Sequence, residues 1–336
     1  MSIRLLARVA AGLGLCAALS ASAASPYSGL VVFGDSLSDS GNNAALITGA
    51  LGGVPQLPIT SDGYYSKYPS LAGTYSNGPV WTQYLAQSLG LTLAPSVLGG
   101  TNYAFGGAQT GTDGDEPLAP GFPFSMRRQL DWYLGASGNV ADPNALYIVA
   151  GGGNNVRAAL EAIAGGADAA AVGAATVAGY AADMAGLVAD LKLAGAQHVL
   201  VLNTPNFGLT PLAGAMGVGT EATALSWAMN NALAAALAGS GASTFDVFGF
   251  MTQTVAAGAA SGFSNWTNAC GAAANACDVD TALFWDGIHP TARGHQQLAA
   301  AVLATAVPEP ATVLLFAAGL AVIALVRRQR AGGQPR

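Results

Sequence analysis

Three uninterrupted runs of apolar residues constrain the fold of this chain more than any other feature of its sequence. Each run has the length of a strand but lacks the polar alternation of a half-exposed sheet: 30–33 (LVVF), 145–149 (ALYIV) and 198–202 (HVLVL). Such strands are typical of a sheet that is buried on both faces. Longer helical stretches separate them, so the sequence predicts an α/β domain with a parallel sheet and helices on both sides.

Weaker patterns add further strands, helices and loops to this sheet. Two shorter β-rich stretches are candidate strands, 101–105 and 244–248. Helical patterns predict five helices, over 80–89, 126–134, 169–193, 221–237 (with Thr220 as its N-cap) and 291–306. Two stretches rich in Gly, Pro, Asp and Tyr are predicted to be long loops, a class that is commonly functional: 49–75 and 106–125. No linker or fixed-period repeat interrupts residues 25–306, which predicts one domain there.

The two ends of the chain read as sorting signals. Residues 1–24 contain two arginines, an apolar run and small residues, which is the order of a secretory signal peptide. The apolar run over 9–19 is shorter than the roughly 20 residues that a permanent membrane anchor needs. Residues 307–336 begin with VPEP and contain an uncharged apolar run over 311–326 followed by arginines. This pattern predicts a transmembrane segment whose arginine end faces the cytoplasm.

Composition excludes several classes of protein. Hydrophobic residues make up 52% of the chain and charged residues 9%, which excludes an intrinsically disordered protein. The net charge of −6 offers no basic face, so no nucleic-acid partner is expected. The three histidines lack metal-ligand spacing, and neither a P-loop nor a GxGxxG motif occurs, so we expect no metal and no cofactor. Six of the twelve basic residues lie in the two end segments, so the middle is acidic and disfavours anionic substrates.

Three residues stand where catalysis by a serine nucleophile would need them. Ser36 directly follows the first apolar strand, at the sheet edge where parallel α/β folds bind ligands. A helix beginning just after Ser36 would direct its N-terminal amides at an anion. His289 and Asp286 share a short loop before the last helix, and a serine needs such a base, itself oriented by a carboxylate. The alternative is a turn serine and a His–Asp pair that bond only locally.

Gly-rich segments after other strands are candidates for the donors that acyl transfer needs at its oxyanion. They are NYAFGGA (102–108) and GGGNN (151–155). Four blocks occur along the chain in the order FGDSLSDSGNN, NYAFGGA, GGGNN and DGIHP. Together they resemble the conserved blocks of the GDSL family of the SGNH hydrolases, over about residues 30–305. The resemblance implies a three-layer α/β/α sandwich with a flavodoxin-like parallel sheet of about five strands. It also implies a serine ester hydrolase.

The resemblance assigns a role to each matching residue. Ser36 would be the nucleophile, His289 the base and Asp286 the residue that orients it. The oxyanion hole would consist of the Ser36 N–H, the Gly107 N–H and the Asn154 side chain.

At two positions in these blocks the match to the family is less direct. Gly106 stays an alternative to Gly107 within the glycine doublet. Asn155 stands where the family commonly has Asp, which predicts a changed supporting hydrogen bond rather than a changed oxyanion donor.

The C-terminal sequence VPEPATVLLFAAGLAVIALVRRQR resembles the PEP-CTERM sorting signal of Gram-negative bacteria. This resemblance implies recognition by an exosortase and a location at the cell envelope, cell surface or extracellular matrix. The expected processing partners are therefore a signal peptidase and an exosortase-type enzyme, with membrane contact through the C-terminal segment before processing. An exported location permits cysteines to pair, so we predict a disulfide between Cys270 and Cys277, with two free buried thiols as the alternative.

These observations lead to the hypothesis of an exported serine ester hydrolase that acts on an acyl ester, a lipid or an acetylated glycan. A polysaccharide O-deacetylase and a catalytically inactive surface or matrix protein with the same fold are the alternatives. Tyrosines of the 49–75 loop suit either a sugar or an acyl chain, so the sequence does not separate these functions.

Overall fold

The structure is a computed structural model, and it describes residues 25–307. The predicted signal peptide (1–24) and the predicted transmembrane segment (311–326) lie outside the described residues. The domain boundaries at 24/25 and 306/307 therefore stay predictions. Within the described part, one parallel sheet has the strand order β1-β2-β3-β4, formed by β1 (Leu30–Gly34), β2 (Leu146–Ala150), β3 (His198–Leu202) and β4 (Ser243–Phe245).

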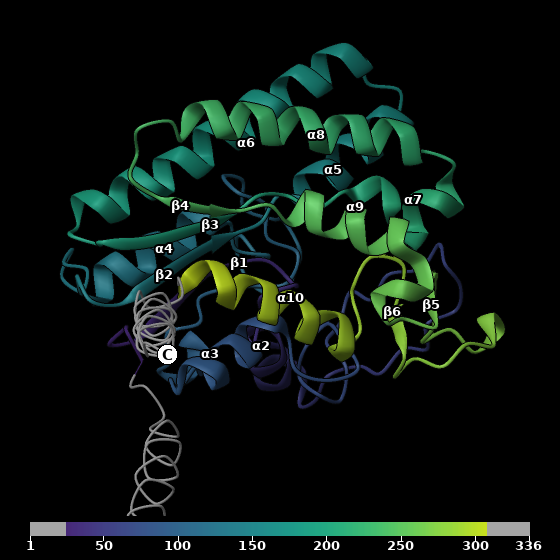
Figure 1. The fold of residues 1–336 in the computed structure, drawn as a ribbon, viewed down its shortest axis with the longest axis horizontal. Helices are drawn as coiled ribbons and strands as arrows, with labels where there is room; N and C mark the ends of the chain where they lie inside the picture. The colour runs from purple at the N-terminus through teal and green to yellow at the C-terminus, as the bar shows by residue number, and fades with distance from the viewer. Residues whose placement is uncertain (1–24, 308–336) are drawn as a thin grey trace, which may run out of the picture.

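Helices cover both faces of this sheet, as Figure 1 shows. Val31 and Phe33 point into the core under one helical layer, whereas Leu30 and Val32 point into the core under the other. The first layer contains α4 (Met126–Ala136), α5 (Gly153–Ala164), α6 (Ala169–Leu193) and α8 (Gly219–Ala236). The second contains α3 (Trp81–Leu89) and α10 (Ala292–Ala306). Burial on both faces explains the unbroken apolar runs, and the predicted three-layer α/β fold with its parallel sheet is confirmed.

The predicted strand at 101–105 lies along the free edge of β1 but is not a regular strand. The amides of Tyr103 and Phe105 donate to the carbonyls of Val32 (2.7 Å) and Gly34 (3.2 Å), and the Val32 amide donates to the Thr101 carbonyl (3.1 Å). The segment therefore occupies the place of a fifth, irregular strand beside β1.

The predicted strand at 244–248 is only partly right. Its first residues form β4, but Asp246 then accepts a hydrogen bond from the Gly249 amide (2.9 Å) and caps α9 (Val247–Ala257). The helix propensity of an aspartate-capped segment outweighs the β propensity of the aromatic residues that follow.

The five predicted helices are present, but Thr220 is not an N-cap. The helix α8 begins at Gly219, so Thr220 lies inside its first turn. Sequence patterns missed further helices, α2 (Asn42–Leu51), α5, α7 (Pro211–Met216) and α9, and the short 3-10 helices η2 (Ser96–Leu98), η3 (Phe207–Leu209), η4 (Gly258–Ser261) and η5 (Ala273–Asn275).

A second, two-stranded sheet pairs β5 (Asn265–Ala269) with β6 (Ala282–Phe284). A disulfide joins Cys270 and Cys277 in the connection between these strands. Asp62 ties the long loop before α3 to this region, because its carboxylate accepts hydrogen bonds from the Ala269 amide (2.7 Å) and the Asn275 side chain (2.7 Å). The loop is thereby fixed beside β5, and the partner strand β6 leads directly to residues 286–289.

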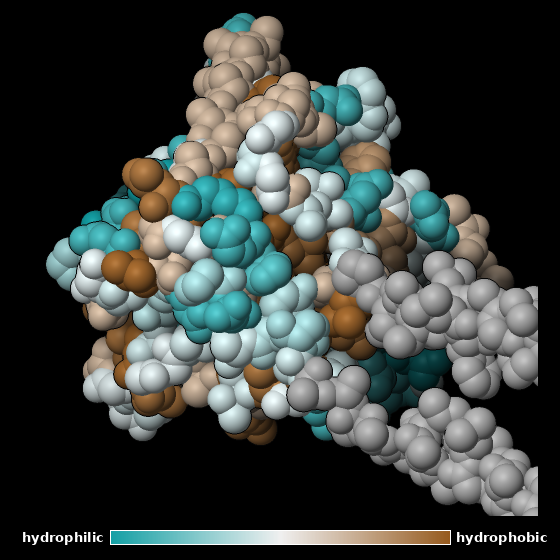
Figure 2. Space-filling model, turned by 60° about the vertical axis from the view of Figure 1, so that its left-hand side comes forward, coloured by the Kyte–Doolittle hydropathy of each residue, from teal (hydrophilic) through white to brown (hydrophobic). Residues whose placement is uncertain are grey.

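The helix α6 is long and apolar enough to cross a membrane by length and composition, the one such helix among residues 25–307. Its C-terminal half packs against the sheet through Tyr180, Met184, Leu187 and Leu191, as expected of a core helix. Its N-terminal half stands at the top of the molecule in Figure 1 and is largely exposed. Figure 2 shows the hydrophobic side chains of another face as patches separated by hydrophilic residues.

Candidate active site

The end of β1 positions Ser36 at the carboxyl edge of the sheet. Gly34 passes so close to β2 that a Cβ there would lie 2.6 Å from the carbonyl oxygen of Ala150. The buried Gln129 of α4 holds this strand end, since it accepts from the Gly34 amide (2.9 Å) and donates to the Gly34 carbonyl (2.8 Å) and the Phe124 carbonyl (3.0 Å). Ser36 follows this fixed point and is only 5% exposed.

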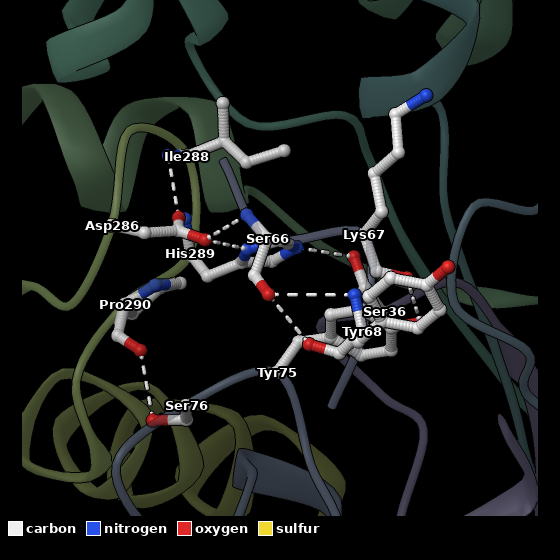
Figure 3. Close-up of polar contacts among 10 residues, drawn as sticks. All are labelled: Ser36, Ser66, Lys67, Tyr68, Tyr75, Ser76, Asp286, Ile288, His289 and Pro290. Atoms are coloured by element: carbon white, nitrogen blue, oxygen red, sulfur yellow. Dashed lines mark hydrogen bonds and ion pairs between the residues drawn. The ribbon is translucent and has the colours of Figure 1, made fainter. Parts of the chain in front are cut away.

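The structure brings Ser36, His289 and Asp286 into one chain of hydrogen bonds (Figure 3). The Ser36 Oγ lies 2.9 Å from Nε2 of His289, and Nδ1 of that ring lies 2.8 Å from Oδ2 of Asp286. All three side chains are buried. This is the geometry in which a histidine can take a serine proton while a carboxylate stabilises the resulting imidazolium.

Backbone amides hold the Asp286 carboxylate in place. Its Oδ1 accepts from the amides of Ile288 (2.9 Å) and His289 (2.8 Å), and its Oδ2 also accepts from the amide of Ser66 (2.7 Å). Ser66 belongs to the long loop before α3, and the neighbouring Tyr64 carbonyl accepts from the Gly287 amide (2.7 Å). A buried carboxylate needs such donors in place of water, so the loop completes the environment of the candidate triad.

The turn after Ser36 is organised by Asp39. Its Oδ1 accepts from the amides of Gly41 (2.8 Å) and Asn42 (2.6 Å), and its Oδ2 accepts from the amide of Gly106 (3.2 Å). Burial raises the pKa of Asp39 to about 6, although these donors act in the opposite direction. The helix α2 begins at Asn42 and gives its first amides to Asp39. A helix thus follows Ser36 as expected, but it begins only at Asn42, and its first amides meet the Asp39 carboxylate rather than a ligand beside Ser36.

The glycine doublet at 106–107 presents two different amides. Gly106 donates to Asp39, and a Cβ at Gly106 would lie 2.2 Å from the Tyr75 ring. The Gly107 amide has no hydrogen-bond acceptor among residues 25–307, and Gly107 lines the same cavity as Ser36. Its φ of +86° also requires glycine. Gly107 is thus better placed than Gly106 to donate to a ligand at Ser36.

Asn154 lies in the first turn of α5 and faces the same cavity. Its Nδ2 donates to the Ala108 carbonyl (3.0 Å), which leaves its second amide hydrogen for a ligand. The N-terminus of α5 adds a positive partial charge at this place. The neighbouring Asn155 accepts from the Thr110 amide (3.2 Å) and donates to the Thr110 hydroxyl (3.0 Å). Asn155 therefore supports the loop that carries Gly107.

Two cavities of opposite character meet at Ser36, Asn154 and His289. One, of about 230 Å³, is lined mainly by polar side chains, among them Tyr65, Lys67, Gln109, Glu116 and Arg157. The other, of about 80 Å³, is lined mainly by apolar side chains, among them Phe207, Phe250, Met251, Phe284 and Leu298. A ligand bound at Ser36 can therefore extend a polar part to one side and an apolar part to the other.

The remaining histidines and a buried aspartate complete the titratable groups of interest. His198 is exposed at the start of β3, where its ring contacts that of Tyr27 edge-on. His295 of α10 is fully buried, and burial lowers its pKa to about 3. Burial disfavours the charged form of Asp35 as well, which for a carboxyl group raises the pKa, here to about 6. Among residues 25–307, no group of three or more His, Cys, Asp or Glu residues is placed to hold a metal ion.

Comparison with known proteins identifies the family. Residues 30–302 match the GDSL-like lipase/acylhydrolase family. The chain belongs to this family. The GDSL protein is 30% identical to Esterase EstA of Pseudomonas aeruginosa over 321 residues. This alignment covers 82% of this chain and 46% of the esterase. Over 185 residues the GDSL protein is 35% identical to Lipase 1 of Photorhabdus luminescens, 55% of this chain and 23% of the lipase. The chain thus spans less than half the length of these relatives.

Solved structures give the GDSL protein more distant neighbours. An aryl esterase of M. smegmatis is 16% identical, with a TM-score of 0.43 over 82% of this chain and 95% of the other. A lipase/acylhydrolase from Enterococcus faecalis is 12% identical, with a TM-score of 0.42 over 82% of this chain and 92% of the other. Residues 306–330 match the PEP-CTERM protein-sorting motif, which implies an exported, cell-surface protein that an exosortase processes.

Sequence reasoning missed several supporting residues of this GDSL site. Gln129 and Ser66 carry no motif, and their contacts to Gly34 and Asp286 arise from folding alone. Arg157 could have been found, because it follows Asn154 by three positions at the start of a helix and so shares its face.

Proposed function

We propose that this GDSL protein is an exported serine ester hydrolase that cleaves carboxylic esters through an acyl-enzyme on Ser36. The observation that carries the proposal is the hydrogen-bond chain from Asp286 through His289 to Ser36, which opens onto a cavity lined by Gly107 and Asn154. A nucleophile, its base and free amide donors around one cavity are the parts that acyl transfer requires.

In the acylation step, the Ser36 Oγ attacks the ester carbonyl carbon while Nε2 of His289 takes the hydroxyl proton. The Asp286 carboxylate accepts the Nδ1–H and stabilises the imidazolium. The carbonyl oxygen becomes an oxyanion, which accepts hydrogen bonds from the amides of Ser36 and Gly107 and from Nδ2 of Asn154. When the carbon–oxygen bond to the alcohol breaks, the imidazolium gives its proton to the leaving alkoxide.

Deacylation repeats these steps with water. His289 takes a proton from a water molecule that attacks the acyl carbon, and the same donors stabilise the second oxyanion. The acid then leaves and Ser36 Oγ regains the proton. The buried Asp286, held by the Ser66 amide, keeps the imidazole in the same orientation through both halves of the reaction.

The two cavities favour one substrate class over the alternatives. We infer that the apolar cavity beside α9 takes the acyl chain and that the polar cavity takes the alcohol. An acetyl group would leave the apolar cavity unfilled, so this arrangement supports a longer acyl ester over a polysaccharide O-deacetylase. The complete set of candidate catalytic groups speaks against an inactive surface or matrix protein.

Hydrolysis of p-nitrophenyl acetate, butyrate and octanoate by the purified protein tests this proposal. Ser36→Ala should abolish turnover of all three esters, and unchanged turnover in that variant would reject the mechanism. Met251→Trp should fill the apolar cavity and lower octanoate hydrolysis more than acetate hydrolysis. Met216→Trp, at a half-exposed methionine of α7 that does not line either cavity, is the matched control. Equal loss on all three esters in Met251→Trp would remove the acyl chain from this cavity.

A further inference from the structure

Arg157 lies one helical turn after Asn154 on the same face of α5. Its Nη2 donates to Oδ1 of Asn154 (3.4 Å). Its Nη1 donates to the hydroxyl of Tyr65 (3.0 Å) and pairs with Oε1 of Glu161 (2.7 Å), one further turn along the helix. The guanidinium thus contacts Tyr65 and Glu161 through one nitrogen and the carbonyl oxygen of the Asn154 side chain through another.

The orientation of that amide decides whether Asn154 can serve an oxyanion. With Nδ2 toward the cavity it offers a donor, whereas a flipped amide would present Oδ1 and repel negative charge. Two contacts favour the first orientation, since Ala108 offers a carbonyl to Nδ2 and Arg157 offers a donor to Oδ1. A flip would set the NH₂ group against a cation and Oδ1 against a carbonyl oxygen.

We propose that Arg157 is a positioning residue that orients and polarises the Asn154 amide for oxyanion stabilisation. A cation bound to Oδ1 draws electron density from the amide and strengthens its N–H donor. The Nε of Arg157 is buried without a hydrogen-bond partner among residues 25–307. A side chain present only for a surface ion pair would keep that donor in water, so the burial supports a role at the site. The inference rests on the proposed esterase activity.

Arg157 also lines the polar cavity, so direct binding of substrate is the competing explanation. The two roles differ in kinetics. A group that binds the substrate equally in its ground and transition states changes KM, whereas a group that acts on the oxyanion through Asn154 changes kcat. They also differ in coupling, because the positioning role requires Asn154 to be present.

A double-mutant cycle with p-nitrophenyl butyrate separates these roles. Arg157→Met should lower kcat on the order of tenfold with KM within about twofold, a fraction of the 10²–10³ expected for losing an oxyanion donor. In the Asn154→Ala background the same substitution should change kcat by less than about twofold. Arg157→Lys keeps the positive charge but lacks the planar guanidinium with its several donors, so it should recover part of kcat.

Lys67→Met is the matched control for charge in the cavity. Lys67 lines the same cavity, but Figure 3 shows its ammonium group pointing away from Ser36 and His289. The change in kcat that Lys67→Met causes should be the same in the wild-type and Asn154→Ala backgrounds, and a loss that disappears in the Asn154→Ala background would mean that charge in the cavity, rather than contact with Asn154, is responsible. Should Arg157→Met fail to fold, Glu161→Gln removes one anchor of Arg157 and should lower kcat only when Asn154 is present.

Three outcomes would overturn the inference: equal loss of kcat in both backgrounds, a change confined to KM, or unaltered kinetics in a folded Arg157→Met variant. Failure of the proposed function looks different. In that case the wild-type protein shows no Ser36-dependent turnover of the ester at all.

Discussion

Replacing His295 by leucine should make this protein less sensitive to acid. The imidazole is 0% exposed, and neither ring nitrogen has a hydrogen-bond partner among residues 25–307. Burial, with a smaller contribution from the charge on His289, lowers the pKa of His295 from 6.5 to about 3. Unfolding returns the ring to water and to its ordinary pKa. Between about pH 6.5 and 3 the unfolded state therefore binds more protons, and the free energy of unfolding falls as the pH falls.

The size of this effect follows from the two pKa values. At pH 5 the ring is protonated in the unfolded state and neutral in the folded state. The interval of about 1.5 pH units below 6.5, at about 1.4 kcal/mol per unit, gives a loss of roughly 2 kcal/mol relative to pH 7.5. Leucine does not bind a proton, so the His295→Leu variant lacks this loss of unfolding free energy between pH 7.5 and pH 5. It also removes two unpartnered polar atoms from the core, so the variant should be no less stable than the wild type at pH 7.5.

Two buried carboxyl groups change the free energy of unfolding with pH in the opposite direction. Their contribution cancels when the wild type and the His295→Leu variant are compared at the same pH. Burial raises the pKa of Asp35 and Asp39 from 3.8 to about 6, so their folded forms bind more protons between these values and stability rises as the pH falls through this window. Both groups are present in the wild type and the variant. The difference between the two proteins at each pH therefore isolates His295.

Urea unfolding at pH 7.5 and pH 5.0 measures that difference. The stability of His295→Leu relative to wild type should increase by about 2 kcal/mol on going to pH 5.0, with equal m-values. His198→Leu, at the exposed histidine of β3, should show no such increase. Parallel pH dependence in wild type and His295→Leu would refute the reasoning, because it would mean that His295 binds protons equally in both states.

Three further variants test the site and the structure that supports it. Asn154→Ala should lower kcat on the order of 10²–10³ with little change in KM, as steady-state ester hydrolysis would show; a loss below threefold would remove Asn154 from the oxyanion hole. Gln129→Met should cost about 2–3 kcal/mol in urea unfolding, because the Gly34 amide and the Phe124 carbonyl lose their bonds to Gln129 and the Gly34 carbonyl keeps only the bond from the Phe105 amide. The double substitution of Cys270 and Cys277 by Ser should cost about 2 kcal/mol in the same assay through loss of a small cross-linked loop.

The sheet could be predicted from sequence because its strands are buried on both faces. Apart from His198, which is exposed where β3 begins, the runs at 30–33, 145–149 and 198–202 are buried, and they form β1, β2 and β3. The segment 101–105 was harder, because it lies at the edge of the sheet and is held from one side by β1. Local propensity failed most clearly at 247–248, where the Asp246 cap starts a helix within residues of β type.

The candidate site likewise contains residues that the sequence predicted and a choice between residues that it could not make. Motifs predicted Ser36, Asp286 and His289, and in the structure His289 is within hydrogen-bond distance of both other residues. The sequence could not separate Gly106 from Gly107, because the difference depends on Asp39, a residue 67 positions away that takes the Gly106 amide. Contacts of this range have no periodic pattern and exist only once the fold has formed.

The long loop before α3 shows how irregular backbone becomes part of the site. Residues 62, 64 and 66 each contact the region around the site: the Asp62 side chain contacts β5, the Tyr64 carbonyl accepts from Gly287, and the Ser66 amide donates to Asp286. Residues 61–64 form a turn, closed by a hydrogen bond from the Tyr64 amide to the Ser61 carbonyl (3.1 Å), and the backbone that follows this turn lies against residues 286–287. Ser66 lies 220 positions from Asp286, yet it supplies one of the donors that a buried carboxylate requires. The environment of the candidate triad is therefore complete only when this loop is docked, so the site depends on contacts between segments that are far apart in the sequence.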